Sequence, residues 1–172
     1  LLSGYPYNNN SSDNYDLKSK FIKKGSHFTL LLLDNDHSFN RTHSQQLIFT
    51  PILESFYKIF FKLLLNDTSI SLIIKSKKSK IISNLPSLHH LIDEAKLTGR
   101  CFIDSDPYGK TSLTYFEITD LVVSTGVYFS SALCELVLLG KRGLFFDYPN
   151  LENFEKDLYK IGGVPVLIKA LL

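Results

Sequence analysis

Short runs rich in apolar residues alternate with segments of helical periodicity along most of the chain. Apolar residues that follow one another directly predict buried strands at 27–33, 69–74, 101–104, 120–124 and 143–147. Between them, apolar residues recur at spacings of three and four, which predicts helices at 45–65, 85–97, 113–118, 130–139 and 151–161. The last segment, 166–172, is predicted to begin a further helix.

The predicted strands are apolar throughout rather than on alternate residues, which is typical of a parallel sheet covered on both faces. Strands and helices in alternation then predict an α/β fold: a Rossmann-like doubly wound parallel sheet of about five strands with helices on both faces. Pro86 near the start of one helix, and Gly99 and Gly140 just beyond the ends of two, support these boundaries. In such a sheet ligands bind outside the carboxyl ends of the strands, so the residues that follow each strand are the candidates for a site.

The first 24 residues differ from the rest of the chain. They hold a polar, turn-forming run at 8–14, followed by four lysines. We expect residues 1–24 to be a polar linker or tail and residues 25–172 to form the domain. Because the chain begins with Leu1 and contains no Met, we also expect it to be a piece of a longer protein.

Composition narrows the class of protein. A chain of 172 residues, 44% hydrophobic and 21% charged, fits one globular domain. A formal net charge of +2 is too small to indicate nucleic-acid binding. Cys101 and Cys134, the only cysteines, cannot build a structural zinc site, and we expect both to be free thiols.

The apolar runs also bear on the expected location. All are well short of the roughly 20 residues that cross a bilayer, and no signal-peptide core follows Leu1. We therefore expect a cytoplasmic protein. The frequent lysines leave a peripheral association with the inner face of the membrane open.

Charged residues follow the first two predicted strands. Asp34 and Asp36 come after the first strand; two such carboxylates could share a metal ion or act as nucleophile and acid, or could simply cap a solvated turn. The second strand runs into Lys75 and further lysines. A cation at the mouth of a parallel sheet could hold phosphate, although such a run could equally be a solvated face.

The most informative stretch follows the fourth predicted strand. Ser124, Thr125 and Gly126 lead out of the strand, and Ser130 and Ser131 begin the next helix. A helix N-terminus presents free backbone N–H groups and a partial positive charge, so hydroxyls and a glycine at this turn suit an anion such as phosphate. Capping of the helix by one of the two serines is the simpler interpretation and is compatible with a ligand.

Other features refine the candidate chemistry. Glu135, one turn into that helix, could accept hydrogen bonds from sugar hydroxyls or could lie on the surface. The glycine-rich dinucleotide motif, the P-loop and the hydrolase elbow are all absent from the sequence. The pair His89-His90 lacks a His-Glu-x-x-His frame and is expected to be structural, so no metal site is predicted.

The pattern resembles the C-terminal donor-binding domain of GT-B fold glycosyltransferases, especially bacterial enzymes of surface polysaccharide biosynthesis. The matching segments are 72–78, 120–125 and 130–147, within a resemblance that covers about residues 27–160. Segment 72–78 is a predicted strand that ends in a basic residue, and segment 120–125 is a predicted strand that leads into a hydroxyl-rich turn. Segment 130–147 is a predicted helix with an acidic residue, followed by Gly-Lys and another strand. The fold would then be half of a GT-B enzyme.

The resemblance implies a nucleotide-sugar donor as ligand and transfer of the sugar to a surface glycan or lipid acceptor. Lys75 and the turn at 124–131 would face the diphosphate, and Glu135 would meet a ribose or sugar hydroxyl. No cofactor is implied. The N-terminal domain of the same protein would be the missing partner, and the isolated domain is expected to be inactive.

This sequence departs from the family at two places. Ser76-Lys77 stands where His-Pro is expected after the basic residue, and the second glutamate of the retaining families would fall on Gly143. The catalytic base of inverting GT-B enzymes generally lies in the N-terminal domain. No catalytic residue is therefore named, and the retaining or inverting outcome stays open.

Two other functions remain alternatives. A haloacid-dehalogenase-like phosphatase would use Asp34 as nucleophile and Asp36 as acid, with Ser124 or Thr125 and then Lys141 as its next motifs. No pair of acidic residues follows the final predicted strand, where only Asp147 appears, so the Mg²⁺ site of such a phosphatase would be incomplete. The other alternative is a non-catalytic nucleotide-binding α/β module.

Overall fold

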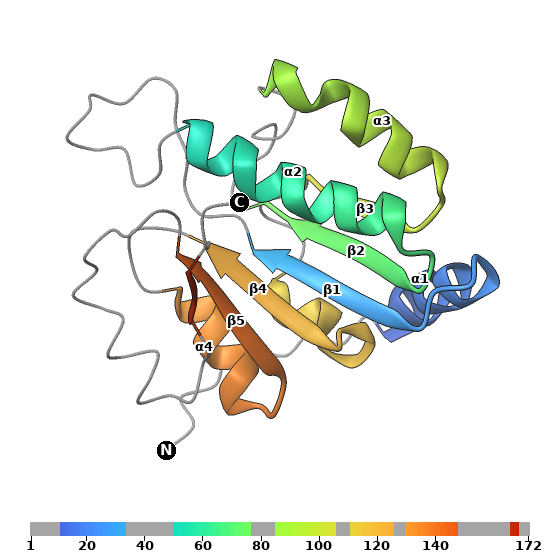
Figure 1. The fold of residues 1–172 in the computed structure, drawn as a ribbon. Coiled ribbons are helices and arrows are strands. Elements are labelled where there is room, and N and C mark those ends of the chain that lie inside the picture. The colour runs from blue at the N-terminus through green and yellow to red at the C-terminus, as the bar shows by residue number, and fades with distance from the viewer. Residues whose placement is uncertain are drawn as a thin grey trace.

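A computed structural model describes residues 11–33, 50–76, 85–105, 111–125, 130–147 and 166–168. Within these ranges one sheet contains six strands in the order β3-β2-β1-β4-β5-β6, and every neighbouring pair is parallel. The strands are β1 (Phe28–Leu33), β2 (Ile70–Lys75), β3 (Cys101–Asp104), β4 (Leu121–Thr125), β5 (Arg142–Asp147) and β6 (Val166–Ile168). The predicted Rossmann-like doubly wound sheet is confirmed (Figure 1).

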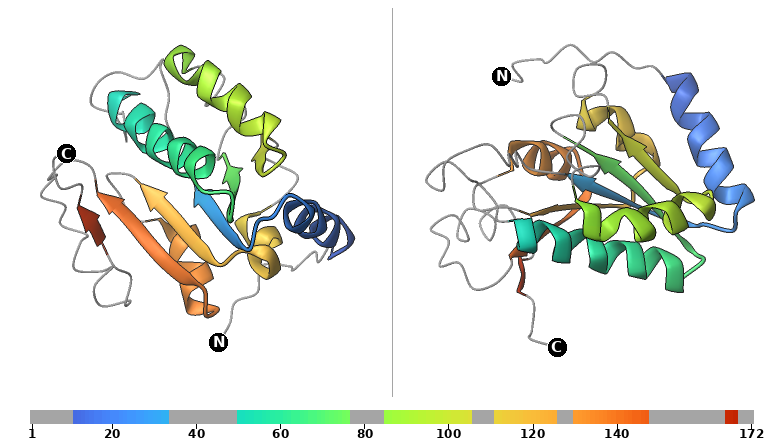
Figure 2. Two further views of the ribbon diagram at one scale, coloured as in Figure 1. Left: turned by 45° about the vertical axis from the view of Figure 1, so that its right-hand side comes forward. Right: turned by 90° about the horizontal axis from the view of Figure 1, so that it is seen from above.

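Helices cover both faces of the sheet (Figure 2). One face carries α2 (Thr50–Asn66), the short 3₁₀ segment η3 (Pro86–Leu88) and α3 (His89–Leu97). The other carries α1 (Ser11–Lys23), the 3₁₀ segment η4 (Ser112–Ile118) and α4 (Ser131–Leu138). We call these the α2 face and the α4 face.

The strands are apolar throughout because each of them supplies two cores. Successive side chains of a strand point to opposite faces of the sheet. Leu30 and Leu32 of β1 therefore enter the core under α2 and α3, whereas Leu31 and Leu33 enter the core under η4 and α4. All four are buried, which explains why the pattern does not alternate.

Residues 11–23, expected to lie in a polar linker or tail, form α1 instead. Leu17 and Phe21 lie one turn apart and pack into the core of the α4 face, where Phe21 is only 3% exposed. Most of the rest of the helix is polar, and its other large hydrophobic side chains, Tyr15 and Ile22, are exposed. An apolar stripe this narrow is hard to recognise among lysines and asparagines, and the contact with the sheet makes the helix part of the domain.

The prediction of a helix from residue 166 is wrong, because Val166–Ile168 is strand β6, parallel to β5. A short apolar run fits a buried strand or a buried helix equally well, and periodicity does not separate the two. The sheet consequently has a sixth strand. The helix predicted at 45–65 appears as α2 from Thr50 onward, and the one predicted at 151–161 lies outside the described residues.

A buried arginine, Arg100, joins the end of α2 to the sheet. Its guanidinium donates hydrogen bonds to the carbonyl oxygens of Leu64 (2.9 Å), Asp67 (2.7 Å) and Ile70 (2.6 Å). Carbonyls at a helix C-terminus lack intrahelical donors and carry partial negative charge, so they can satisfy a buried cation. Arg100 thus holds together the end of α2, the turn that follows it and the start of β2.

Candidate functional site

The switch point of this sheet lies at β1 and β4. From β1 the chain crosses to β2 on one side, and β4 begins the strands on the other side. Doubly wound sheets bind ligands outside the carboxyl ends of the strands at such a point. Asp34, Asp36 and Gly126, which follow these two strands, lie outside the described residues.

The strand register brings five side chains into one line near the carboxyl ends. Asp104 of β3, Lys75 of β2, Leu33 of β1, Ser124 of β4 and Phe145 of β5 are successive partners across the sheet. Residues in register on parallel strands point to the same face. Leu33 and Phe145 belong to the core of the α4 face, so Asp104, Lys75 and Ser124 point there as well. We call these three residues the polar row.

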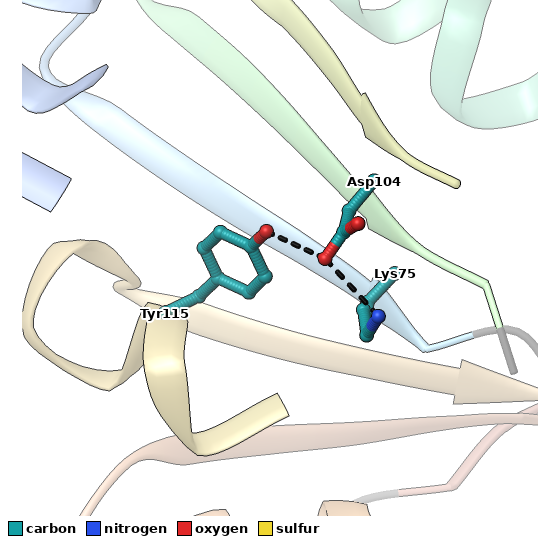
Figure 3. Close-up of polar contacts among 3 residues, drawn as sticks. All are labelled: Lys75, Asp104 and Tyr115. Carbon is teal, nitrogen blue, oxygen red and sulfur yellow. Dashed lines mark hydrogen bonds and ion pairs between the residues drawn. The ribbon is translucent and has the colours of Figure 1, made fainter. Parts of the chain in front are cut away.

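Lys75, the predicted phosphate ligand, lies at the end of β2 as expected, but it is paired. Its Nζ atom is 3.1 Å from Oδ2 of Asp104, and the hydroxyl of Tyr115 on η4 donates to the same oxygen at 2.7 Å (Figure 3). Lys75, Asp104 and Tyr115 are 8%, 6% and 1% exposed. The ammonium is therefore not a solvated charge, because a buried carboxylate balances it.

The sequence did not single out Asp104 or Tyr115. Asp104 is the last residue of a predicted strand, and a survey of strand ends for charged residues could have found it. Tyr115 carries no comparable signal. Its contact depends on how η4 crosses the sheet, which local sequence does not determine.

Ser124 and Thr125 have different roles although they are adjacent on β4. Thr125 points to the opposite face from Ser124, and its hydroxyl donates to the carbonyl of Phe146 on β5 at 2.8 Å. The Ser124 hydroxyl is fully buried and makes no hydrogen bond within the part of the chain that the structure describes. Thr125 therefore links β4 to β5, whereas no described residue bonds the hydroxyl of Ser124 beside the switch point.

The two serines at the start of α4 also differ. Ser130 is buried and caps the helix, its Oγ accepting a hydrogen bond from the Leu133 backbone N–H at 3.3 Å. Ser131 is the exposed first residue of the helix. The capping interpretation is thus confirmed for Ser130. Because α4 packs on the same face of the sheet as Ser124, its N-terminus and the polar row share that face.

Glu135 is half-buried on α4, but it does not point toward the sheet. Leu133 and Leu136 face the core, and at 100° per residue Glu135 lies about 200° around the helix axis from Leu133. The structure therefore brings Ser124, Ser130 and Lys75 to one face and directs Glu135 away from it. Two strand spacings separate Lys75 from Ser124, or about 10 Å between their Cα atoms.

Lys141, which would stand for the third motif of the alternative phosphatase, lies at the amino end of the sheet rather than at the carboxyl end. It directly precedes β5, and its ammonium lies 4.5 Å from the centroid of the Phe116 ring. The strand that separates it from the carboxyl ends spans about 17 Å. This placement counts against a haloacid-dehalogenase-like site with Asp34. Gly143, also near the amino end of β5, is equally remote.

Among the residues that the structure describes, neither the histidines nor the two cysteines form a reactive site. His90 and Glu94 make an exposed pair one turn apart on α3, with Nδ1 and Oε2 3.6 Å apart. Across the described ranges, no group of three or more His, Cys, Asp and Glu could hold a metal ion. Burial raises the pKa of the Cys101 thiol to about 12, and burial together with the charge of Glu135 raises the pKa of Cys134. Both thiols are free and are poor nucleophiles.

Comparisons with known proteins identify no relative of this chain. No protein-family model, no curated protein sequence and no solved structure matches this chain. In the described segments, no helix is both long and apolar enough to cross a membrane. The fold and the carboxyl edge of the sheet are therefore the basis for a functional proposal.

Proposed function

We propose that this chain is the donor-binding domain of a glycosyltransferase and that it binds a nucleotide-sugar at the carboxyl ends of β1 and β4. The doubly wound strand order supports a nucleotide ligand at this position. The resemblance of segments 72–78, 120–125 and 130–147 to GT-B donor domains supports the sugar-nucleotide class and transfer to a surface glycan or lipid acceptor.

The buried hydroxyl of Ser124 is the observation that carries this proposal. A buried polar group without a partner costs about 1–3 kcal/mol, and folded proteins keep few of them. Ser124 lies at the switch point, on the face that carries α4. A phosphate oxygen placed there would accept the hydrogen bond that Ser124 does not make within the described residues.

The N-terminus of α4 would supply the remaining stabilisation. Its free backbone N–H groups and partial positive charge favour an anion, and they would stabilise the nucleoside diphosphate as it leaves the sugar. Ser130 fixes the start of the helix through its cap. On this proposal the N-terminal domain of the longer protein supplies the acceptor site and the catalytic base, so this chain alone binds donor without transferring sugar.

The experiment is a thermal-shift panel with UDP, CDP, GDP and the matching nucleotide-sugars on the wild-type chain, Ser124→Ala and Ser71→Ala. A ligand at 100 times its Kd stabilises a protein by about 2.7 kcal/mol, which is about 5 °C or more for a chain of this size. Ser71 is a matched control: it is buried on the same face, at the amino end of β2, and its hydroxyl lies 2.9 Å from that of Thr29.

We expect one nucleotide to raise the melting temperature of wild type and of Ser71→Ala but not of Ser124→Ala. No shift with any nucleotide would contradict the proposal. A shift with nucleoside diphosphates and none with the matching nucleotide-sugars would favour a non-catalytic nucleotide-binding module. Phosphatase activity that requires Mg²⁺ and is abolished by Asp34→Asn, but not by Glu135→Ala, would replace the proposal with the phosphatase.

A further inference from the structure

We infer that Asp104 competes with the diphosphate of the donor for the ammonium of Lys75, so that the Lys75–Asp104 pair sets how tightly the nucleotide binds. This inference rests on the proposed function and concerns the same edge of the sheet. It assigns a role to Asp104 and Tyr115, which the proposed donor contacts do not use.

Lys75 lies between two positions for negative charge. Asp104 is on β3, the strand on the far side of Lys75 from the switch point, and it contacts the ammonium at 3.1 Å. The proposed diphosphate position lies on the other side, beyond β1 at Ser124. A lysine side chain has a flexible four-carbon stem, so its ammonium can turn from one anion to the other without movement of the strand.

The pair is buried, which makes the competition strong. The side chains of Lys75 and Asp104 are 9% and 6% exposed. Salt and water screen charges in such a place far less than at the surface, so each anion has a large effect on where the ammonium lies. A carboxylate that neutralises Lys75 therefore weakens its attraction for phosphate.

Tyr115 affects how strongly the Asp104 carboxylate attracts the ammonium of Lys75. Its hydroxyl donates to Oδ2 of Asp104, the oxygen that also contacts Lys75. This hydrogen bond stabilises the negative charge when the ammonium turns away, and it weakens the hold of the carboxylate on the ammonium when the two are paired. Loss of the hydroxyl is expected to favour the Lys75–Asp104 pair over a phosphate ligand.

The test measures the Kd of the nucleoside diphosphate that most stabilises the wild-type chain among UDP, CDP and GDP, by isothermal titration calorimetry. Asp104→Asn releases Lys75, and we expect about tenfold tighter binding, the value of one charge-assisted hydrogen bond. Tyr115→Phe strengthens the pair, and we expect about threefold weaker binding. Both variants are expected to lower the melting temperature. The uncharged nucleoside is the control ligand, and its Kd is expected not to change.

A purely structural pair would give lower melting temperatures with unchanged nucleotide affinity in both variants, and that result would overturn the competition alone. Failure of the wild-type chain to bind any of the three nucleotides would overturn the proposed function as well. Where Asp104→Asn does not fold, Tyr115→Phe decides: weaker nucleotide binding with an unchanged nucleoside Kd supports the inference, and unchanged nucleotide binding refutes it.

Discussion

Removal of the Ser124 hydroxyl is expected to make the ligand-free protein more stable. Most substitutions in a core destabilise, so the direction of this change is informative. The hydroxyl is fully buried and makes no hydrogen bond among the described residues. Alanine keeps the Cβ atom and removes only the oxygen, and with it the desolvation cost of about 1–3 kcal/mol.

The magnitude follows from two opposing terms. The lost oxygen leaves a void of roughly 10 Å³, which costs about 0.2 kcal/mol at the rate measured for core cavities. Against this stands the recovered desolvation cost, so we expect Ser124→Ala to gain about 1–2 kcal/mol. For a chain of this length that gain raises the melting temperature by about 2–8 °C.

Ser71→Ala is the control, and it is expected to lower the stability of the protein rather than raise it. The Ser71 hydroxyl is equally buried on the same face, but it lies 2.9 Å from Oγ1 of Thr29 in a hydrogen bond. Its removal takes away that partner of the buried Thr29 hydroxyl, which costs about 1–2 kcal/mol. Urea unfolding followed by circular dichroism measures both variants. Equal destabilisation by the two substitutions would refute the reasoning, because Ser124 would then have a partner that holds it in the ligand-free protein.

Three further predictions concern the rest of the fold. Arg100→Met leaves three carbonyls without their guanidinium donor and is expected to cost about 3–5 kcal/mol in urea unfolding; a loss below about 1 kcal/mol would contradict the role assigned to this side chain. Because the pKa of the partly buried Cys101 thiol is raised to about 12, alkylation of this thiol at pH 8 is expected to be negligible until the protein unfolds, and rapid labelling of the native protein would disprove the raised pKa. Gly99→Ala and Gly140→Ala are each expected to cost about 1–2 kcal/mol in urea unfolding, because both glycines have positive φ, +70° and +97°; no loss in either variant would contradict this reading of the backbone.

The sequence predicts the parallel sheet well because buried strands have a strong and simple signal. Leucine, isoleucine and valine follow one another in β1, β2 and β4, and few other structures bury such a run on both faces. The same reasoning fails for β6, where the run is too short to distinguish a strand from a helix. It also fails for α1, because the contacts that hold Leu17 and Phe21 come from segments distant in the chain.

Some features of the candidate site can likewise be predicted from the sequence, and others cannot. The position of Lys75 and Ser124 at the carboxyl ends follows from the strand pattern, and the cap by Ser130 follows from its place before a helix. The pairing of Lys75 with Asp104 does not follow from the strand pattern, because it depends on β2 and β3 being neighbours in the sheet and on their register. Charge compensation in a parallel sheet is therefore a tertiary property, and a lysine at a strand end is not by itself a phosphate ligand.

The two ends of the α4 face differ in how their polar groups are satisfied. At the amino end, the hydroxyls of Thr29 and Ser71 bond each other, and the Asp120 carboxylate accepts from the Thr29 backbone N–H at 2.8 Å. At the carboxyl end, Asp104 and Lys75 neutralise each other while the Ser124 hydroxyl has no partner among the described residues. At the amino end, the hydroxyls that bond each other stabilise the fold. The carboxyl end holds the buried Ser124 hydroxyl on the same face as a helix N-terminus, and the buried ammonium of Lys75 there is balanced by a carboxylate. A phosphate that binds there would therefore gain most of its stabilisation from backbone N–H groups and hydroxyls rather than from a free cation.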